Sequence, residues 1–141
     1  MTTTTPPKPV CRRGDVVLVL FPHADLRGAK TRPALIVQAD DLCAGLPQVV
    51  VAIITGRMFR AGHPSRVVVL RDSPLGRDSG LLGDSVVMTD NLATVSEMAI
   101  ERVIGRLQME SVDSALRCTL ALRGHQKRAP RPKSPSRKRA G

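Results

Sequence analysis

Three short segments carry the side chains whose types and spacing suit chemistry. The first is residues 21–35, where basic or titratable groups that include His23 and Lys30 precede Arg32. Pro33 restrains the backbone next to Arg32, and a planar guanidinium fork suits bidentate contact with a phosphate. A surface ion pair would explain Arg32 equally well. We therefore treat Arg32 as a candidate phosphate ligand and the rest of this segment as a solvated loop.

The other two segments end apolar runs with polar side chains. Residues 53–57 finish with Thr55, Gly56 and Arg57, where a hydroxyl beside a glycine corner would let a phosphate approach closely. A threonine at a strand end also commonly bonds its own backbone. The third segment is residues 86–94, in which Asp90 follows another apolar run. A carboxylate in such a position acts as a general base or, more frequently, forms a turn.

Several other kinds of site are absent from the sequence. It has no Gly-rich phosphate loop, no Ser-His-Asp order and no acidic cluster that would hold two metal ions. The cysteines Cys11, Cys43 and Cys118 are far apart, and none of the three histidines stands at a zinc-ligand spacing from them. We expect mostly structural thiols, with one disulfide still open, and neither a metal nor a cofactor.

The elements that must position the three segments are short strands. Apolar runs bounded by turn residues predict strands over residues 14–21, 33–37, 49–55, 66–70 and 85–89, and residues 102–107 suit a sixth. No connection holds a helix long enough for a parallel crossover, so the sheet should be mostly antiparallel.

One helix is expected to follow the strands. The apolar spacing from Val112 to Leu122 is that of an amphipathic helix, with Gly124 where a C-terminal cap belongs. A short helix with Ser96 as its cap is expected over residues 96–100. Together these elements predict a mainly β fold with a C-terminal helix, in which a small sheet curls into a partly closed barrel.

The net charge of +10 belongs mostly to the ends of the chain. Eight of the 22 Lys and Arg residues lie from Arg123 to Gly141 and three lie before Gly14. The middle segment therefore has 11 basic residues against all 12 acidic ones, a net charge of −1. Because a basic tail attracts any polyanion, charge favours RNA, DNA and an acidic partner about equally.

Composition also predicts the domain boundaries and the compartment. A chain of 141 residues suits one domain, which we expect over residues 14–124, between disordered tails at 1–13 and 125–141 that are rich in Pro, Thr or basic residues. No apolar stretch approaches the roughly 20 residues of a membrane span, and the N-terminus lacks a signal-peptide core. We expect a cytoplasmic protein that does not enter a membrane.

Taken in order, these segments resemble the MazF/PemK family of toxins over residues 14–122. The landmarks are residues 14–17 (GDVV), 31–35 (TRPAL), 51–55 (VAIIT), 84–87 (DSVV) and 104–107 (IGRL). Their order and spacing are specific, whereas any single one is weak. The resemblance implies an SH3-like small barrel, usually a homodimer. It would be the toxin of a type II toxin–antitoxin system that cleaves single-stranded RNA at short sequences without a metal.

The resemblance also assigns roles to residues. The family's active-site arginine falls on Arg32 and its strand-end hydroxyl on Thr55, and Asp90 and Thr94 match as well. Arg32 would stabilise the charge on the phosphate and Thr55 would hydrogen-bond it. Asp90, or else His23, would take the 2′-OH proton, which leaves a 2′,3′-cyclic phosphate and a 5′-hydroxyl. The expected RNA-binding residues are His23, Lys30, Arg57 and Thr94.

Two departures from the family keep other functions open. Many relatives carry arginine where this chain has Met88 and Ala93. That loss favours a non-catalytic member of the fold that binds nucleic acid or an antitoxin, whereas Arg32 and Thr55 favour the enzyme. A third hypothesis is a structural β-barrel adaptor that works through its basic tail. The partner implied by the family is an antitoxin with an acidic, extended segment.

Overall fold

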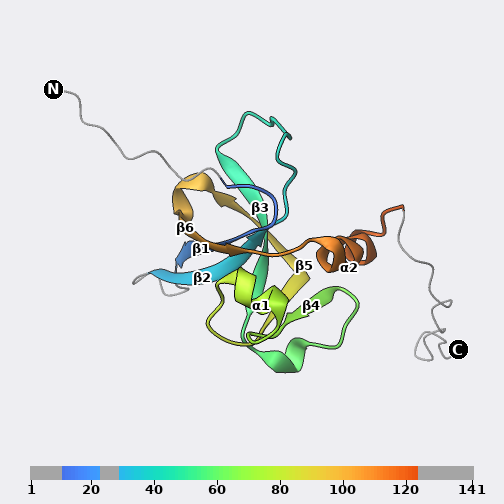
Figure 1. The fold of residues 1–141 in the computed structure, drawn as a ribbon. Helices are drawn as coiled ribbons and strands as arrows, with labels where there is room; N and C mark the ends of the chain where they lie inside the picture. Colours follow the sequence, from blue (N-terminus) through green and yellow to red (C-terminus); the bar gives the residue numbers. More distant parts are fainter. Residues whose placement is uncertain (1–10, 23–28, 124–141) are drawn as a thin grey trace, which may run out of the picture.

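The computed structural model describes residues 11–22 and 29–123, which build a single sheet with helices packed on it (Figure 1). The strands are β1 Asp15–Pro22, β2 Ala29–Ile36, β3 Gln48–Thr55, β4 Arg66–Val69, β5 Ser85–Ser96 and β6 Ile100–Arg106. They stand in the order β4-β5-β3-β2-β1-β6, and every neighbouring pair is antiparallel. The prediction of a mostly antiparallel sheet followed by a C-terminal helix is confirmed.

Helices and turns occupy the connections between strands. The helices are α1 Pro74–Ser79 and α2 Glu110–Leu120, and the 3₁₀ turns are η1 Met58–Arg60 and η2 Glu97–Ala99. Helix α2 packs against β4 and β5 (Figure 1). None of the helices in the described part of the chain is long and apolar enough to cross a membrane.

The sheet is open in its hydrogen bonding, with β4 and β6 as its edges. The edges are nevertheless bridged, because α1 follows β4 in the chain and packs on β6. A Cβ atom added at Gly80 would overlap the backbone of Ile104, and one added at Gly105 would overlap that of Ser79. Such close approach requires residues without side chains. The sheet itself is therefore not closed into a barrel, and α1 spans the gap between its edges.

The central strands bury both of their faces. Successive side chains of a strand point to opposite sides, so a strand covered on both sides needs an unbroken apolar run. One apolar cluster, which includes α2, takes Val16, Leu35, Ala52, Ile54, Val87, Val112 and Leu116. The second, on the other face, takes Val17, Val19, Ala34, Ile36, Val51 and Val95. This explains why β1 and β3 read as continuous valine- and isoleucine-rich segments.

Strand β2 begins earlier than the sequence indicates. The predicted start was Pro33, but β2 begins at Ala29, so Lys30 and Arg32 belong to the strand and not to a loop. Pro33 pairs with Leu18 of β1, whereas pairing with β3 is confined to Ala34–Ile36. The first half of β2 is thus not paired with β3. Pro33 is tolerated in this half because its missing amide proton costs no hydrogen bond to β3.

Strand β5 is also longer than predicted, because a bulge lies within it. Its pairing with β3 passes from Met88↔Ile53 to Leu92↔Ala52, which leaves residues 89–91 outside the ladder. The sequence prediction stopped at this bulge, since Asp90 and Asn91 resemble turn residues.

The remaining differences concern helices. The connection predicted over residues 72–84 contains α1, capped by Ser73, whose Oγ accepts a hydrogen bond from the amide of Gly76 at 3.0 Å. Ser96 caps η2 as predicted, with its Oγ 3.1 Å from the amide of Met98. Helix α2 ends at Leu120 and is capped by Ala121, which is left-handed with φ 54°. The predicted cap, Gly124, lies outside the described residues.

The contact between α1 and β6 predicts how the fold responds to a single methyl group. Gly105→Ala should lower the free energy of unfolding by about 2 kcal/mol, because the methyl meets fixed backbone of Ser79. Gly83→Ala is the control, since a Cβ there meets nothing within 4 Å. Urea unfolding followed by circular dichroism measures both; equal midpoints for the two variants would contradict the close approach.

Candidate functional site

A cleft of about 590 Å³ opens where β2 and β3 separate. The two strands pair from Ile36↔Val51 to Ala34↔Ile53 and no further. Arg32 and Thr55 lie just beyond the paired part of the two strands, and both line this cleft. The lining consists of Lys30, Thr31, Arg32, Pro33, Ile53, Ile54, Thr55, Gly56, Arg57, Arg60, Met88 and Asn91.

The hydroxyl of Thr55 is held by the turn that follows β3. Its Oγ accepts a hydrogen bond from the amide of Arg57 at 3.1 Å. This is the local backbone bond that a strand-end threonine commonly forms. A hydroxyl carries one donor proton besides its acceptor lone pairs, so the bond leaves the proton of Thr55 available to a ligand oxygen. Gly56 lies beside it with nothing within 4 Å of its added Cβ position, which leaves open space at the corner.

Charge in the cleft is of one sign. Its lining contains four cations, Lys30, Arg32, Arg57 and Arg60, and no carboxylate among the described residues. The ion pairs of the described chain are Arg13–Asp113, Arg66–Asp90 and Arg106–Asp15, and none includes a cation of the cleft. A concave surface of one sign concentrates ligands of the opposite sign. The cleft is therefore suited to a polyanion.

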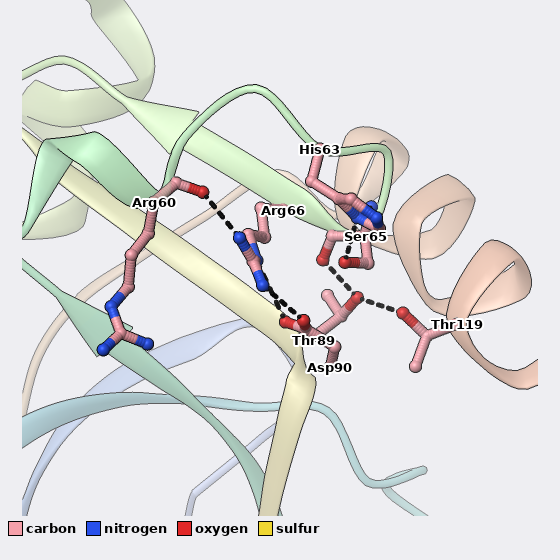
Figure 2. A network of polar contacts seen from close by, with 7 residues as sticks. All are labelled: Arg60, His63, Ser65, Arg66, Thr89, Asp90 and Thr119. Carbon is pink, nitrogen blue, oxygen red and sulfur yellow. Dashed lines mark hydrogen bonds and ion pairs between the residues drawn. The ribbon is translucent and has the colours of Figure 1, made fainter. Parts of the chain in front are cut away.

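Asp90 lies outside this lining and is bound to Arg66 of β4. The Nη2 and Nε atoms of Arg66 lie 2.8 and 3.3 Å from the two carboxylate oxygens (Figure 2). The hydrogen bonds from Arg66 hold the pKa of Asp90 below its ordinary value, and the same contact raises that of Arg66. A carboxylate with a lowered pKa is a weak proton acceptor. The role of general base stays a prediction for Asp90, and this geometry does not favour it.

A polar network anchors the β5 bulge to the rest of the molecule. The buried Thr89 donates through its amide and hydroxyl to the carbonyl of Ser65, at 3.0 and 2.6 Å. The Oγ1 of Thr89 also lies 2.9 Å from that of Thr119 in α2 (Figure 2). His63 contacts the hydroxyl of Ser65 through Nδ1 at 2.7 Å. These bonds fix the segment that carries Asp90 against both β4 and α2.

Not every predicted site residue comes to the cleft. Lys30, Arg32, Thr55 and Arg57 do, whereas His23 lies outside the described residues. Thr94 is exposed on β5 opposite Val50 and does not line the cleft.

Met88 and Ala93, the residues at which many relatives carry arginine, are apolar and packed. Met88 is buried in the cleft lining, beside Ile53 on β3 and Arg66 on β4. Ala93 packs against the second apolar cluster. Neither therefore brings a charge to the site.

Arg60 and Asn91 also line the cleft, and neither of them was singled out from the sequence. Arg60 belongs to a turn without a recognisable motif, and Asn91 belongs to the bulge, so no spacing rule points to either. The part of the chain that the structure describes contains no group of three or more His, Cys, Asp or Glu side chains that would hold a metal ion.

Comparison with known proteins assigns the chain that forms this cleft to a family. Residues 12–121 match the model of the PemK-like, MazF-like toxins of type II toxin–antitoxin systems. The chain belongs to this family. The match covers nearly all of the described residues, so the sheet, the cleft and α2 are all parts of a MazF-like toxin fold.

Solved structures agree with this assignment. The chain is similar to the Mycobacterium tuberculosis toxin MazF-mt6 at 26% identity and a TM-score of 0.59, over 77% of this chain and 97% of that one. An endoribonuclease from mycobacterial species gives 24% identity and a TM-score of 0.59, over 82% and 95%. MazF in a MazE–MazF crystal structure from Deinococcus radiodurans gives 20% and 0.61, over 81% and 98%. The last two support the fold alone.

The Arg66–Asp90 pair predicts how stability depends on pH. Because the pKa of Asp90 is lowered in the folded state, the pair stabilises the fold above the unfolded-state pKa of about 3.9. That stabilisation is lost as the pH falls through the lower folded-state value. Asp90→Asn should therefore lower the urea midpoint at pH 7, and its difference from the wild type should shrink below about pH 4.

The control is Asp78→Asn on α1, an exposed carboxylate outside the ion pairs found in the described chain. Its midpoint should follow that of the wild type at every pH. An Asp90→Asn difference that stays constant from pH 7 to pH 3 would rule out a pair that titrates.

Proposed function

We propose that this MazF-like toxin is a metal-independent endoribonuclease that cleaves single-stranded RNA at short sequences. The observation that carries the proposal is that Arg32 and Thr55 line one cleft together with three further cations and no described carboxylate. An arginine and a hydroxyl donor in the same cleft suit a phosphodiester that contacts both of them. Membership of the toxin family supports the same reaction.

The reaction is an attack within the RNA backbone. The 2′-oxygen loses its proton and bonds to the adjacent phosphorus, and the bond from phosphorus to the 5′-oxygen breaks as that oxygen gains a proton. The products are a 2′,3′-cyclic phosphate and a 5′-hydroxyl, and no water is consumed in this step. The need for a 2′-hydroxyl restricts the substrate to RNA.

Arg32 and Thr55 divide the stabilisation of the transition state between them. Negative charge grows on the nonbridging phosphate oxygens as the phosphorus becomes five-coordinate, and preorganised donors stabilise that charge. Arg32 supplies a guanidinium that stays protonated, and Thr55 supplies the hydroxyl proton that its bond from Arg57 leaves available. Lys30 and Arg57 hold the flanking phosphates.

Removal of the 2′-OH proton has two candidates. One is Asp90. Its carboxylate is already bonded to Arg66 and its pKa is lowered, which supports a positioning role for it rather than proton removal. His23, outside the described residues, is the other candidate for this step.

The proposed partner is an antitoxin whose acidic segment competes with RNA for the cations of the cleft. Among the similar structures, a mycobacterial endoribonuclease was solved with its cognate antitoxin, and the Deinococcus radiodurans toxin as MazE–MazF. We further propose that the chain forms a homodimer in the cytoplasm, where its RNA substrate is found.

The alternative function is binding without catalysis. It is favoured by Met88, which places a buried thioether in the cleft lining where a further cation would stabilise the phosphate. In that case the cleft would bind single-stranded RNA or the acidic segment of an antitoxin and leave the RNA intact.

Cleavage of a long mixed-sequence RNA in EDTA tests the proposal. The wild type should produce fragments with 2′,3′-cyclic phosphate ends, and Arg32→Ala should cleave about 100-fold more slowly or worse. Thr55→Val should lose about as much, whereas Thr55→Ser keeps the hydroxyl and should retain most activity. An intact RNA with bound wild-type protein would favour the binding function, and full activity in Arg32→Ala would refute the assigned site.

A further inference from the structure

The cleft contains one cation whose position the sequence does not indicate. Arg60 ends η1, the turn between β3 and β4, and its guanidinium side chain lines the cleft with Arg32 and Thr55. Turn η1 is closed by bonds of 3.0 Å from the amide of Arg60 to the carbonyl of Arg57 and from the amide of Ala61 to that of Met58. The side chain is therefore carried by a rigid turn.

The backbone of Arg60 is also fixed from the neighbouring strand. Its carbonyl accepts a hydrogen bond from Nη1 of Arg66 at 3.0 Å, and Arg66 is held in turn by Asp90. Figure 2 shows the carbonyl of Arg60 turned toward Arg66 and its guanidinium extended away from that pair. Asp90 thus holds the backbone of Arg60 through Arg66 but does not neutralise its charge.

The side chain of Arg60 has an unused donor. Its Nε atom is buried and has no hydrogen-bond partner among the described residues. A buried donor is nearly always paired in a native protein, so one that is not requires an explanation, and binding of a ligand by the same guanidinium is one. The guanidinium carbon lies 5.6 Å from the ring centroid of Phe59, and such a contact orients a cation without occupying its donors.

The cleft indicates what the guanidinium of Arg60 would bind. Its described lining holds no carboxylate, and Met88 contributes a thioether from β5. An arginine with unused donors in a cation-lined cleft suits an anion with several oxygens, and an RNA phosphate is the anion that the proposed function brings there.

We propose that Arg60 is a phosphate-binding residue of this site, delivered by the turn η1 and oriented by Phe59. This inference rests on the proposed function for the identity of its ligand, the phosphodiester of single-stranded RNA. Arg60 and Arg32 bind nonbridging oxygens of the phosphate in the cleft, and Arg60 supplies the charge that Met88 does not.

The first experiment measures binding to an uncleavable ligand at several salt concentrations. The full chain is titrated with a fluorescent 2′-deoxy oligonucleotide of mixed sequence, and the logarithm of the association constant is plotted against that of the salt concentration. Arg60→Gln should reduce the magnitude of the slope by about 0.7, the value for one lost phosphate contact on a single strand. Arg71→Gln removes an exposed charge outside the cleft and should leave the slope unchanged.

The second experiment measures cleavage of RNA by the same variants. Arg60→Gln should slow cleavage by about 100-fold, as expected for loss of one donor to the reacting phosphate. Arg60→Lys keeps the charge without the guanidinium fork and should recover part of the rate. Thermal unfolding should show similar midpoints for Arg60→Gln and the wild type, which a purely structural role would not give.

A measurement on the unmutated protein covers the case in which Arg60→Gln fails to fold. The Nε–H resonance of Arg60 in ¹H–¹⁵N spectra should shift when the 2′-deoxy oligonucleotide is added. An unchanged resonance, or a salt slope equal to that of the wild type, would overturn the proposal.

The outcomes separate the two proposals. An unchanged slope together with cleavage that depends on Arg32 removes the role of Arg60 and leaves the endoribonuclease intact. A reduced slope with an RNA that is never cleaved leaves Arg60 as a phosphate ligand and removes the endoribonuclease.

Discussion

The early end of the β2–β3 ladder is the constraint on which the site depends. Only Ala34–Ile36 of β2 pair with β3, although both strands continue beyond that point. Strand β2 stays extended because β1 pairs with it from Ala29 to Leu35, and β3 stays extended because β5 pairs with it as far as Thr55. Each strand is thus supported from its far side, and the space between them forms a cleft without loss of either strand.

A second layer of polar contacts keeps that cleft in shape. The β5 bulge releases Asp90 from the ladder, so its carboxylate reaches Arg66, and Arg66 in turn fixes the carbonyl of Arg60. Thr89 in the same bulge is tied to Ser65 and to α2. Because these bonds share residues, the effects of substitutions at them on the free energy of unfolding should not be additive. The bulge therefore connects the helix, the β4 edge and the turn that carries a cation of the site.

The sequence was informative where a short pattern determines the structure by itself. Apolar runs bounded by turn residues predicted the strands of the core, and the apolar spacing from Val112 predicted α2. Arg32 and Thr55 were found because each stands beside a strong signal, a proline and the end of an apolar run.

The features that were missed depend on contacts between distant segments. The proline suggested a strand start at Pro33, and only the absence of β3 pairing there shows why β2 continues through it. The bulge ended the predicted fifth strand too early, because Asp90 and Asn91 look like turn residues until β3 is seen to pair again at Leu92. Arg60 is a site residue because η1 brings it to a cleft that residues of β2, β3 and β5 also line.

The charge distribution implies a conflict between stability and binding. Four cations around one cleft repel each other, and a carboxylate among them would stabilise the folded chain. The same carboxylate would neutralise the groups that bind an anion and would repel the anion itself. Asp90 lies close enough to pair with Arg66 but outside the cleft lining, so it stabilises the scaffold and leaves the cleft its charge. The repulsion is then offset by the apolar core on the two faces of the sheet, and any polyanion that enters the cleft stabilises the fold as it binds.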